Sequence, residues 1–146
     1  MASDNFSVKG GCRCTDNPVR FEYTKEPYEV HYCLCTDCTD ISGGAMAIIA
    51  VVERKAFKVL QAEDKIQNFD TKPTCHRRFC KVCGCHMFLY VDAFPDHLLL
   101  HVPTFDREAD VGKKPDRWVF VNSKHALVTL PEDGLPRHPG WAGTAG

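Results

Sequence analysis

The sequence predicts a mainly β protein, built as a small single-domain β-sandwich or open barrel. Short apolar segments recur along the chain, and turn-forming residues separate many of them. No segment carries the sustained apolar stripe that marks an amphipathic helix. The 146 residues are enough for one domain with its own core, so we expect residues 1–146 to form a single unit.

The strands follow from the residue pattern in chain order. Residues 19–23 alternate apolar and charged side chains, which favours a strand with one buried face, whereas residues 45–52 are apolar throughout, as in a strand buried on both faces. One helical turn is expected within residues 33–42, and the Pro- and Gly-rich tail from about residue 131 predicts an irregular arm. Further strands are expected at 57–60, 66–69, 87–91, 97–102 and 117–121.

The charge balance and hydropathy argue against several classes of partner. Eighteen basic side chains face nineteen acidic ones, so nothing attracts the chain to nucleic acid or to an anionic membrane. No apolar run approaches the roughly 20 residues needed to span a bilayer, and the N-terminal residues lack the apolar core of a signal peptide. We expect a cytoplasmic protein with a small-molecule substrate, no nucleic-acid partner and no membrane partner.

Nine cysteines are the unusual feature of the composition. In a reducing compartment, clustered cysteines indicate metal ligands before disulfides. The disulfide framework of a secreted domain is the alternative, and both the odd count and the missing signal peptide weigh against it.

Two cysteine pairs can close one zinc site between them. Cys80 and Cys83 are followed by Gly84, which is the pattern of a zinc knuckle, where the turn directs both sulfurs at one metal. Cys12 and Cys14 precede a predicted strand and supply a second pair. Four thiolates around one zinc make a closed site, which is structural rather than catalytic.

The remaining group, Cys33, Cys35 and Cys38, has three thiols and leaves alternatives open. A second closed site would need His31, Cys75 or Cys85 as its fourth ligand. Buried free cysteines without a metal are a further alternative. A three-ligand zinc with water or substrate in the fourth position is the usual pattern of a catalytic site.

At these residues the chain resembles the glutathione-dependent formaldehyde-activating enzyme-like family, also called the centromere protein V-like family. The resemblance rests on GGCRC (10–14), HYCLCTDCTDISGGAMA (31–47) and RRFCKVCGCHMFLY (77–90), which agree in order and spacing. It implies a β-rich fold with two zinc ions. One would be structural, on Cys12, Cys14, Cys80 and Cys83, and the second would lie on Cys33, Cys35 and Cys38 with an open position.

The resemblance also implies chemistry at carbon–sulfur bonds, with glutathione as a candidate co-substrate. We therefore predict a zinc-dependent carbon–sulfur lyase, or the reverse thiol addition, acting on adducts of glutathione or another small thiol. A coordinated thiol stays deprotonated on zinc, which suits this reaction. The alternatives are a thiol-independent zinc enzyme, which would hydrolyse, dehydrate or isomerise a small metabolite, and a non-catalytic zinc module.

A proton must also move in such a reaction, and three residues near the metal blocks are candidates for the general acid or base: His31, Asp40 and His86. For each, a solvated side chain or a hydrogen bond to a metal ligand is the plainer role. Arg77 and Arg78 could bind a glutathione carboxylate or lie on the surface. The oligomeric state is not predicted.

Overall fold

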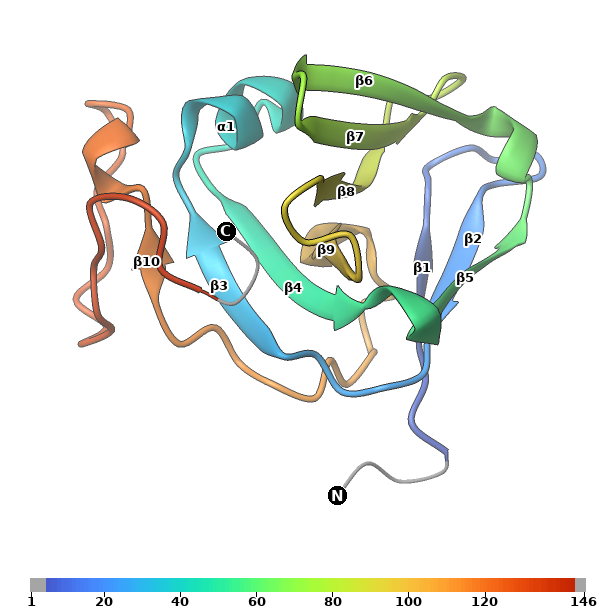
Figure 1. The fold of residues 1–146 in the computed structure, drawn as a ribbon, viewed down its shortest axis with the longest axis horizontal. Helices are drawn as coiled ribbons and strands as arrows, with labels where there is room; N and C mark the ends of the chain where they lie inside the picture. Colours follow the sequence, from blue (N-terminus) through green and yellow to red (C-terminus); the bar gives the residue numbers. More distant parts are fainter. Residues whose placement is uncertain (1–4, 144–146) are drawn as a thin grey trace.

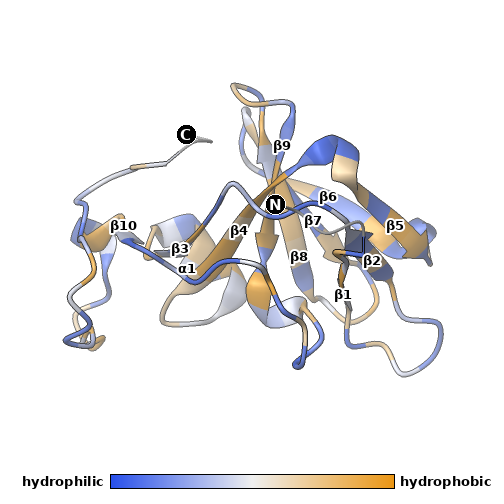
Figure 2. Ribbon diagram, turned by 90° about the horizontal axis from the view of Figure 1, so that it is seen from below, coloured by the Kyte–Doolittle hydropathy of each residue, from blue (hydrophilic) through white to orange (hydrophobic). Residues whose placement is uncertain are grey.

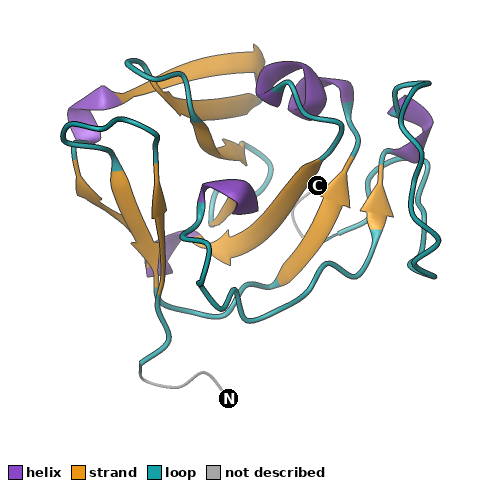
Figure 3. Cartoon of the chain, turned by 180° about the vertical axis from the view of Figure 1, so that it is seen from behind, coloured by secondary structure: helices purple, strands orange, loops and turns teal. Residues whose placement is uncertain are grey.

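The computed structural model describes residues 5–143 and confirms a mainly β architecture made largely of strands and loops (Figures 1 and 3). A three-stranded sheet has the order β1-β2-β5, and a seven-stranded sheet has the order β10-β3-β4-β9-β8-β7-β6. Within the described residues neither sheet closes into a barrel. The strands are β1 Val8–Gly11, β2 Arg20–Tyr23, β3 Glu29–Cys33, β4 Ala47–Glu53, β5 Phe57–Gln61, β6 Ile66–Lys72, β7 Cys75–Cys80, β8 His86–Val91, β9 His97–His101 and β10 Trp118–Val119.

All seven strands expected from the apolar segments are present, with small shifts at their ends. Three further strands, β1, β3 and β7, carry few aliphatic side chains and escape that pattern. β3 and β7 include the buried polar side chains of His31 and Arg77. Both residues lie near Cys33, Cys35 and Cys38, and polar side chains at such positions depart from the usual apolar composition of a buried strand.

The main core fills the space between the two sheets. Phe21 and Tyr23 of β2 pack against the inner face of the large sheet, which includes Val52 of β4 and Leu100 of β9. β4 is hydrophobic along most of its length (Figure 2). Burying each such side chain contributes about 1.5–3 kcal/mol, so this layer holds the sandwich together.

The opposite face of the large sheet carries the short helix α1 (Thr36–Ser42) and a second core, which contains Cys33, Ile49, Leu89 and Leu99. Alternation along each strand places these side chains away from the main core. α1 lies beside the end of β3 and the start of β4 (Figure 1). It begins after Cys35 and ends at Gly43, whose left-handed conformation (φ 70°) closes the last turn.

The C-terminal arm returns beside β10, which pairs in parallel with β3. The amide of Trp118 donates to the carbonyl of Pro136 (2.9 Å), and the amide of Phe120 donates to the carbonyl of Gly140 (3.0 Å). The arm is the orange-to-red segment beyond β3 in Figure 1. None of the helices in residues 5–143 is long and apolar enough to cross a membrane.

Candidate metal centres

The first cysteine cluster brings together the four Sγ atoms of Cys12, Cys14, Cys80 and Cys83, all within 4.8 Å of one another. The Sγ atoms of Cys14 and Cys80 are 3.6 Å apart. A tetrahedral zinc with Zn–S bonds of about 2.3 Å holds its sulfurs about 3.8 Å apart, so the donor set fits zinc. Four sulfurs complete that coordination, and the cluster has the composition of a closed site.

The backbone of Gly11 and Cys12 lies very close to that of Val19 at this cluster. The amide of Cys12 donates to the carbonyl of Val19, and the amide of Val19 donates to Cys12 Sγ, both at 3.1 Å. A Cβ on Gly11 would lie 1.9 Å from the Val19 carbonyl oxygen, so only glycine fits there. In the knuckle, Gly84 has φ +79° and donates its amide to the Cys80 carbonyl (2.8 Å).

The second cluster consists of Cys33, Cys35 and Cys38, whose Sγ atoms also lie within 4.8 Å of one another. Cys33 ends β3, and Cys35 caps α1 by accepting a hydrogen bond from the amide of Cys38 (3.3 Å). No fourth His, Cys, Asp or Glu atom of residues 5–143 joins the group. The spacing of the three sulfurs fits zinc, with one coordination position fewer than a closed site needs.

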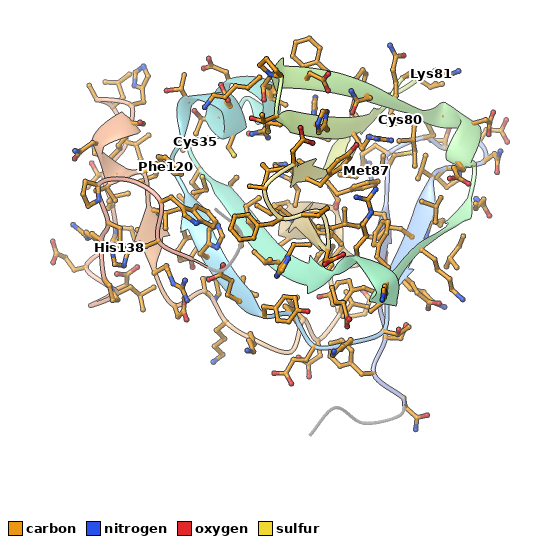
Figure 4. The ribbon with its side chains drawn as sticks, viewed as in Figure 1. Cys35, Cys80, Lys81, Met87, Phe120 and His138 are labelled. Atoms are coloured by element: carbon orange, nitrogen blue, oxygen red, sulfur yellow. The ribbon has the colours of Figure 1, made fainter. Side chains whose placement is uncertain are left out.

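His31, Cys75 and Cys85, the residues that could have filled that position, lie outside the group. Cys75 is a buried free thiol that borders the same cavity as the three cysteines, a cavity of about 460 Å³. Cys85 lies instead near Gly11, beside the four-cysteine cluster. In Figure 4, Cys35 lies below α1 and Cys80 lies at the far end of β7, so the two clusters are well separated.

The pKa values of the three thiols are shifted in different directions. Hydrogen bonds from Cys33 and Cys38 lower the pKa of Cys35, and the amide of Cys38 lowers it further. The same contacts and burial raise the pKa of Cys33. One thiolate is therefore favoured at Cys35, whereas a metal requires all three sulfurs to be deprotonated.

Arg77 places a buried cation against the three-cysteine cluster. Its side chain comes from β7, is 3% exposed and donates from Nη2 to Cys38 Sγ (3.5 Å). Nε donates to Thr71 Oγ1 (3.4 Å), whereas Nη1 is buried without a hydrogen-bond partner among the described residues. A buried guanidinium beside thiolates offsets their negative charge. Arg78, its neighbour, instead lies over the ring of Tyr90.

His31 is fully buried on β3, and the structure describes no hydrogen-bond partner for either ring nitrogen. Burial lowers the pKa of His31 to about 4, although Glu29 opposes this shift. The ring is therefore neutral at pH 7. It packs edge-on against Trp141 of the C-terminal arm, with ring centroids 5.1 Å apart.

A cavity of about 460 Å³ opens onto the three-cysteine cluster and is bordered by all three cysteines. Its walls come from β3, β4, β6, β7, β8, β9, α1 and the C-terminal arm. They include the side chains of His31, Asp37, Ile49, Lys72, Cys75, Arg77, Leu89, Val91, Leu99, Phe120 and Trp141. The volume lies within the roughly 300–1,000 Å³ that is typical of small-molecule sites.

The structure brings only His31 of the three candidate acid–base residues to this cavity. Asp40 is exposed on α1 and lines neither this cavity nor the hollow beside the four-cysteine cluster. His86 borders a separate hollow of about 610 Å³ beside the four-cysteine cluster. Burial lowers the pKa of His86, and Arg77 lowers it further.

His101 is a further buried histidine, at the end of β9. It is 6% exposed and pairs across the sheet with Ile49, which in turn pairs with His31. Burial lowers the pKa of His101 to about 4, and Arg77 and His86 add to the shift. Alternation places His97, Leu99 and His101 on one face of β9, but His101 borders the hollow beside the four-cysteine cluster and not the cavity at the three-cysteine cluster.

Comparison with known proteins agrees with this arrangement. The family model described as glutathione-dependent formaldehyde-activating enzyme matches residues 7–123. A protein of Colletotrichum graminicola is 29% identical over 125 residues, and one of Podospora anserina is 31% identical over 125 residues. Both are provisionally named glutathione-dependent formaldehyde-activating enzymes. The matches cover 82% and 83% of this chain but 63% and 58% of those relatives.

A crystal structure of a Rhodobacter sphaeroides protein has a similar fold. It superposes with a TM-score of 0.57 at 20% identity, covering 76% of this chain and 99% of the other. This likeness supports the fold alone. Because the family model spans most of the described chain, including both cysteine clusters, the chain belongs to the glutathione-dependent formaldehyde-activating enzyme family.

Proposed function

We propose that the chain is a zinc-dependent carbon–sulfur lyase, or catalyses the reverse thiol addition, with adducts of glutathione or another small thiol as substrates. The observation that carries the proposal is the three-cysteine cluster, which has no fourth donor among the described residues and opens onto a cavity. The glutathione-based names of the curated relatives support the same substrate class. The free cysteines suit a reducing, cytoplasmic setting.

The residues of the cluster fit the metal that this function needs. Cys33, Cys35 and Cys38 supply three soft sulfur donors within 4.8 Å of one another, close enough to bind one zinc ion. When bound there, zinc supplies stabilisation of a thiolate, as departing group or as nucleophile. The second ion, on Cys12, Cys14, Cys80 and Cys83, would be structural.

Arg77 balances the charge of this centre. Three thiolates around Zn²⁺ carry a net charge of −1, and a substrate thiolate would raise it to −2. The buried guanidinium of Arg77, in contact with Cys38 Sγ, makes that added negative charge less costly. Arg77 acts on the reaction only through its contact with Cys38 Sγ, and is therefore a positioning residue.

His31 is the proton carrier that the cavity favours. Because burial lowers its pKa to about 4, the neutral ring is a weak base and holds a proton only in passing: it takes the proton that a thiol loses when it adds to an electrophilic carbon and returns it to the oxygen formed there. In the cleavage direction the same proton passes from the hydroxyl oxygen to the departing sulfur. Asp40 and His86 stay sequence predictions with no place in this cavity.

The test follows the exchange between glutathione, an aldehyde and their adduct by NMR, in wild type and in Cys35→Ala with the four-cysteine zinc retained. The proposal expects the exchange rate to fall at least about 100-fold, because even losses outside the ligand sphere cost 10–100-fold. Cys85→Ala, which changes a thiol outside the cluster, should keep the wild-type rate. Equal rates in wild type and Cys35→Ala would reject the site, and turnover without any thiol would favour a thiol-independent zinc reaction.

A further inference from the structure

The cavity beside the three-cysteine cluster has a largely apolar inner wall. Ile49 of β4, Leu89 of β8 and Leu99 of β9 are 1%, 4% and 6% exposed and pack in one layer. Val91, which is partly buried, extends this wall along β8. A ligand group that lies against these apolar side chains is bound best when it is itself apolar, because a polar group would lose its hydration without gaining partners from them. Arg77 and His31 also border the cavity and offer polar nitrogens at other points of its lining.

The mouth of the cavity has a different character. Thr36, Lys72, Thr74 and Ser123 border it and are exposed. Lys72 Nζ lies 3.8 Å from the carboxylate of Asp37, so both signs of charge are present there. A thiol with polar or charged groups is therefore suited to the mouth, and the group bonded to its sulfur is suited to the apolar interior.

The C-terminal arm adds an aromatic wall. Phe120 and Trp141 lie 6.3 Å apart between ring centroids, and the Phe120 amide donates to Gly140, which fixes the arm beside β10. Figure 4 shows Phe120 on the same side of the molecule as Cys35. Trp141 lies beyond residues 7–123, the part that matches the family model, whereas Phe120 lies within that part.

We propose that the electrophilic carbon of the substrate carries an apolar group of several carbons, aliphatic or aromatic, and that Trp141 determines specificity for this group. The inference rests on the proposed function and names its substrate class. A sulfur held at the three-cysteine cluster places its carbon in the cavity of about 460 Å³ that the cluster borders. A one-carbon group such as hydroxymethyl would leave most of the apolar wall without contact, whereas a longer group removes that wall from water.

Thioethers, in which the carbon–sulfur bond is intact, test this inference without relying on turnover. Two series are used, the S-alkyl derivatives of glutathione and those of N-acetylcysteine, from methyl to hexyl and benzyl, with dissociation constants measured by calorimetry on the zinc-loaded protein. The proposal expects affinity to rise about fourfold for each added methylene until the cavity is filled. Equal affinities for all chain lengths in both series, or no binding in either, would overturn it.

Substitutions of Trp141 assign the effect to the arm. Trp141→Ala should at least halve the gain in affinity for each added methylene. Trp141→Phe should restore most of this gain because an aromatic ring again covers the cavity. The matched control is Leu127→Ala, an 88% exposed apolar residue of the same C-terminal region that lies outside the cavity. Unchanged chain-length dependence in a folded Trp141→Ala would contradict the role of Trp141.

The two proposals fail separately. Exchange of the glutathione–formaldehyde adduct at the same efficiency as longer adducts would remove the specificity inference and leave the lyase function. Chain-length-dependent binding that needs Trp141, combined with no exchange of any thiol adduct, would support the cavity assignment and reject the lyase function.

Discussion

Arg77 is a buried cation that contacts the three-cysteine cluster. Its guanidinium contacts Cys38 Sγ, and its other neighbours leave Nη1 without a partner in the described chain. Cys35 has two roles, because its sulfur both caps α1 and belongs to the cluster. At the scale of single residues, the site therefore combines soft donors with a fixed positive charge.

Removing that charge should weaken the metal site. Arg77→Gln is expected to lower zinc affinity at the three-cysteine cluster and the exchange rate by about 10–100-fold, the usual cost of losing a group that supports metal ligands. Competition with a chromophoric chelator measures the affinity. Arg78→Gln is the control, because Arg78 lies over Tyr90 instead of the cysteines. Equal losses in both variants would show that Arg77 acts only through general stability.

Zinc binding at the three-cysteine cluster should weaken as pH falls. Hydrogen bonds with Cys35 and Cys38, and then burial, raise the pKa of Cys33, so zinc must displace a proton that this thiol holds firmly. Competition titrations between pH 8 and 6 should show a falling affinity, and a pH indicator should record proton release on metal addition. An affinity that is independent of pH would contradict three-thiolate ligation.

At the scale of elements, the β1–β2 pairing positions the first cysteine pair. Gly11 pairs with Arg20, and its Cα lies so close to the Val19 carbonyl that a Cβ would overlap it at 1.9 Å. Cys12 follows directly, at the point where the strand ends, and Cys14 comes two residues later. Backbone geometry, not only cysteine spacing, therefore sets this cluster.

Gly11→Ala should disrupt that pairing. The overlap with a backbone oxygen cannot be relieved by a side-chain rotation, so we expect a loss of about 1–3 kcal/mol in the free energy of unfolding, together with weaker zinc at the four-cysteine cluster. Urea unfolding and metal analysis measure the two effects. Gly140→Ala, whose added Cβ would meet nothing within 4 Å, should behave as wild type. Equal stability of the two variants would contradict the close approach.

Strands β3, β4 and β9 form a row in which His31, Ile49 and His101 pair in register. Both histidines have a folded-state pKa of about 4 because of burial, whereas an unfolded histidine titrates near 6.5. As pH falls from about 7 to 4, the unfolded chain binds protons that the folded chain cannot. Stability is therefore complete above that window and is lost within it.

His101→Gln should reduce this acid sensitivity. Each buried neutral histidine accounts for roughly 3 kcal/mol of the loss between pH 7 and 4, so removing one should flatten the pH dependence of unfolding by about that amount. Urea unfolding at fixed zinc concentration, compared between wild type and variant, isolates the histidine from metal release. If wild type and variant lose the same stability between pH 7 and 4, the pKa of His101 is not lowered on folding, and the prediction is wrong.

At the scale of the whole molecule, much of the fold follows from alternation in the sequence. The apolar segments locate seven strands, and cysteine spacing groups the ligands of both clusters as the structure does. β3 and β7 could not be found in this way, because His31 and Arg77 occupy positions where a buried strand normally has aliphatic residues. The position of Trp141 at the cavity depends on how the arm returns beside β10, which no local pattern encodes.

Two metal ions per chain are expected from the two separate clusters, with Cys75 and Cys85 as the cysteines left free. Metal analysis of the purified protein should give two zinc ions, and thiol titration of the loaded, denaturant-free protein should find no more than these two reactive cysteines. One zinc per chain would contradict the two-cluster arrangement.

The central claim is that the three-cysteine cluster holds zinc and accepts a sulfur from a small thiol. X-ray absorption at the zinc edge measures it most directly, as the average number of sulfur ligands per zinc before and after saturation with glutathione. The prediction is an average below four in the free protein, because one site has four cysteines and the other three, rising to four with the thiol. An average of four without thiol, or a lower value that glutathione leaves unchanged, would contradict the claim.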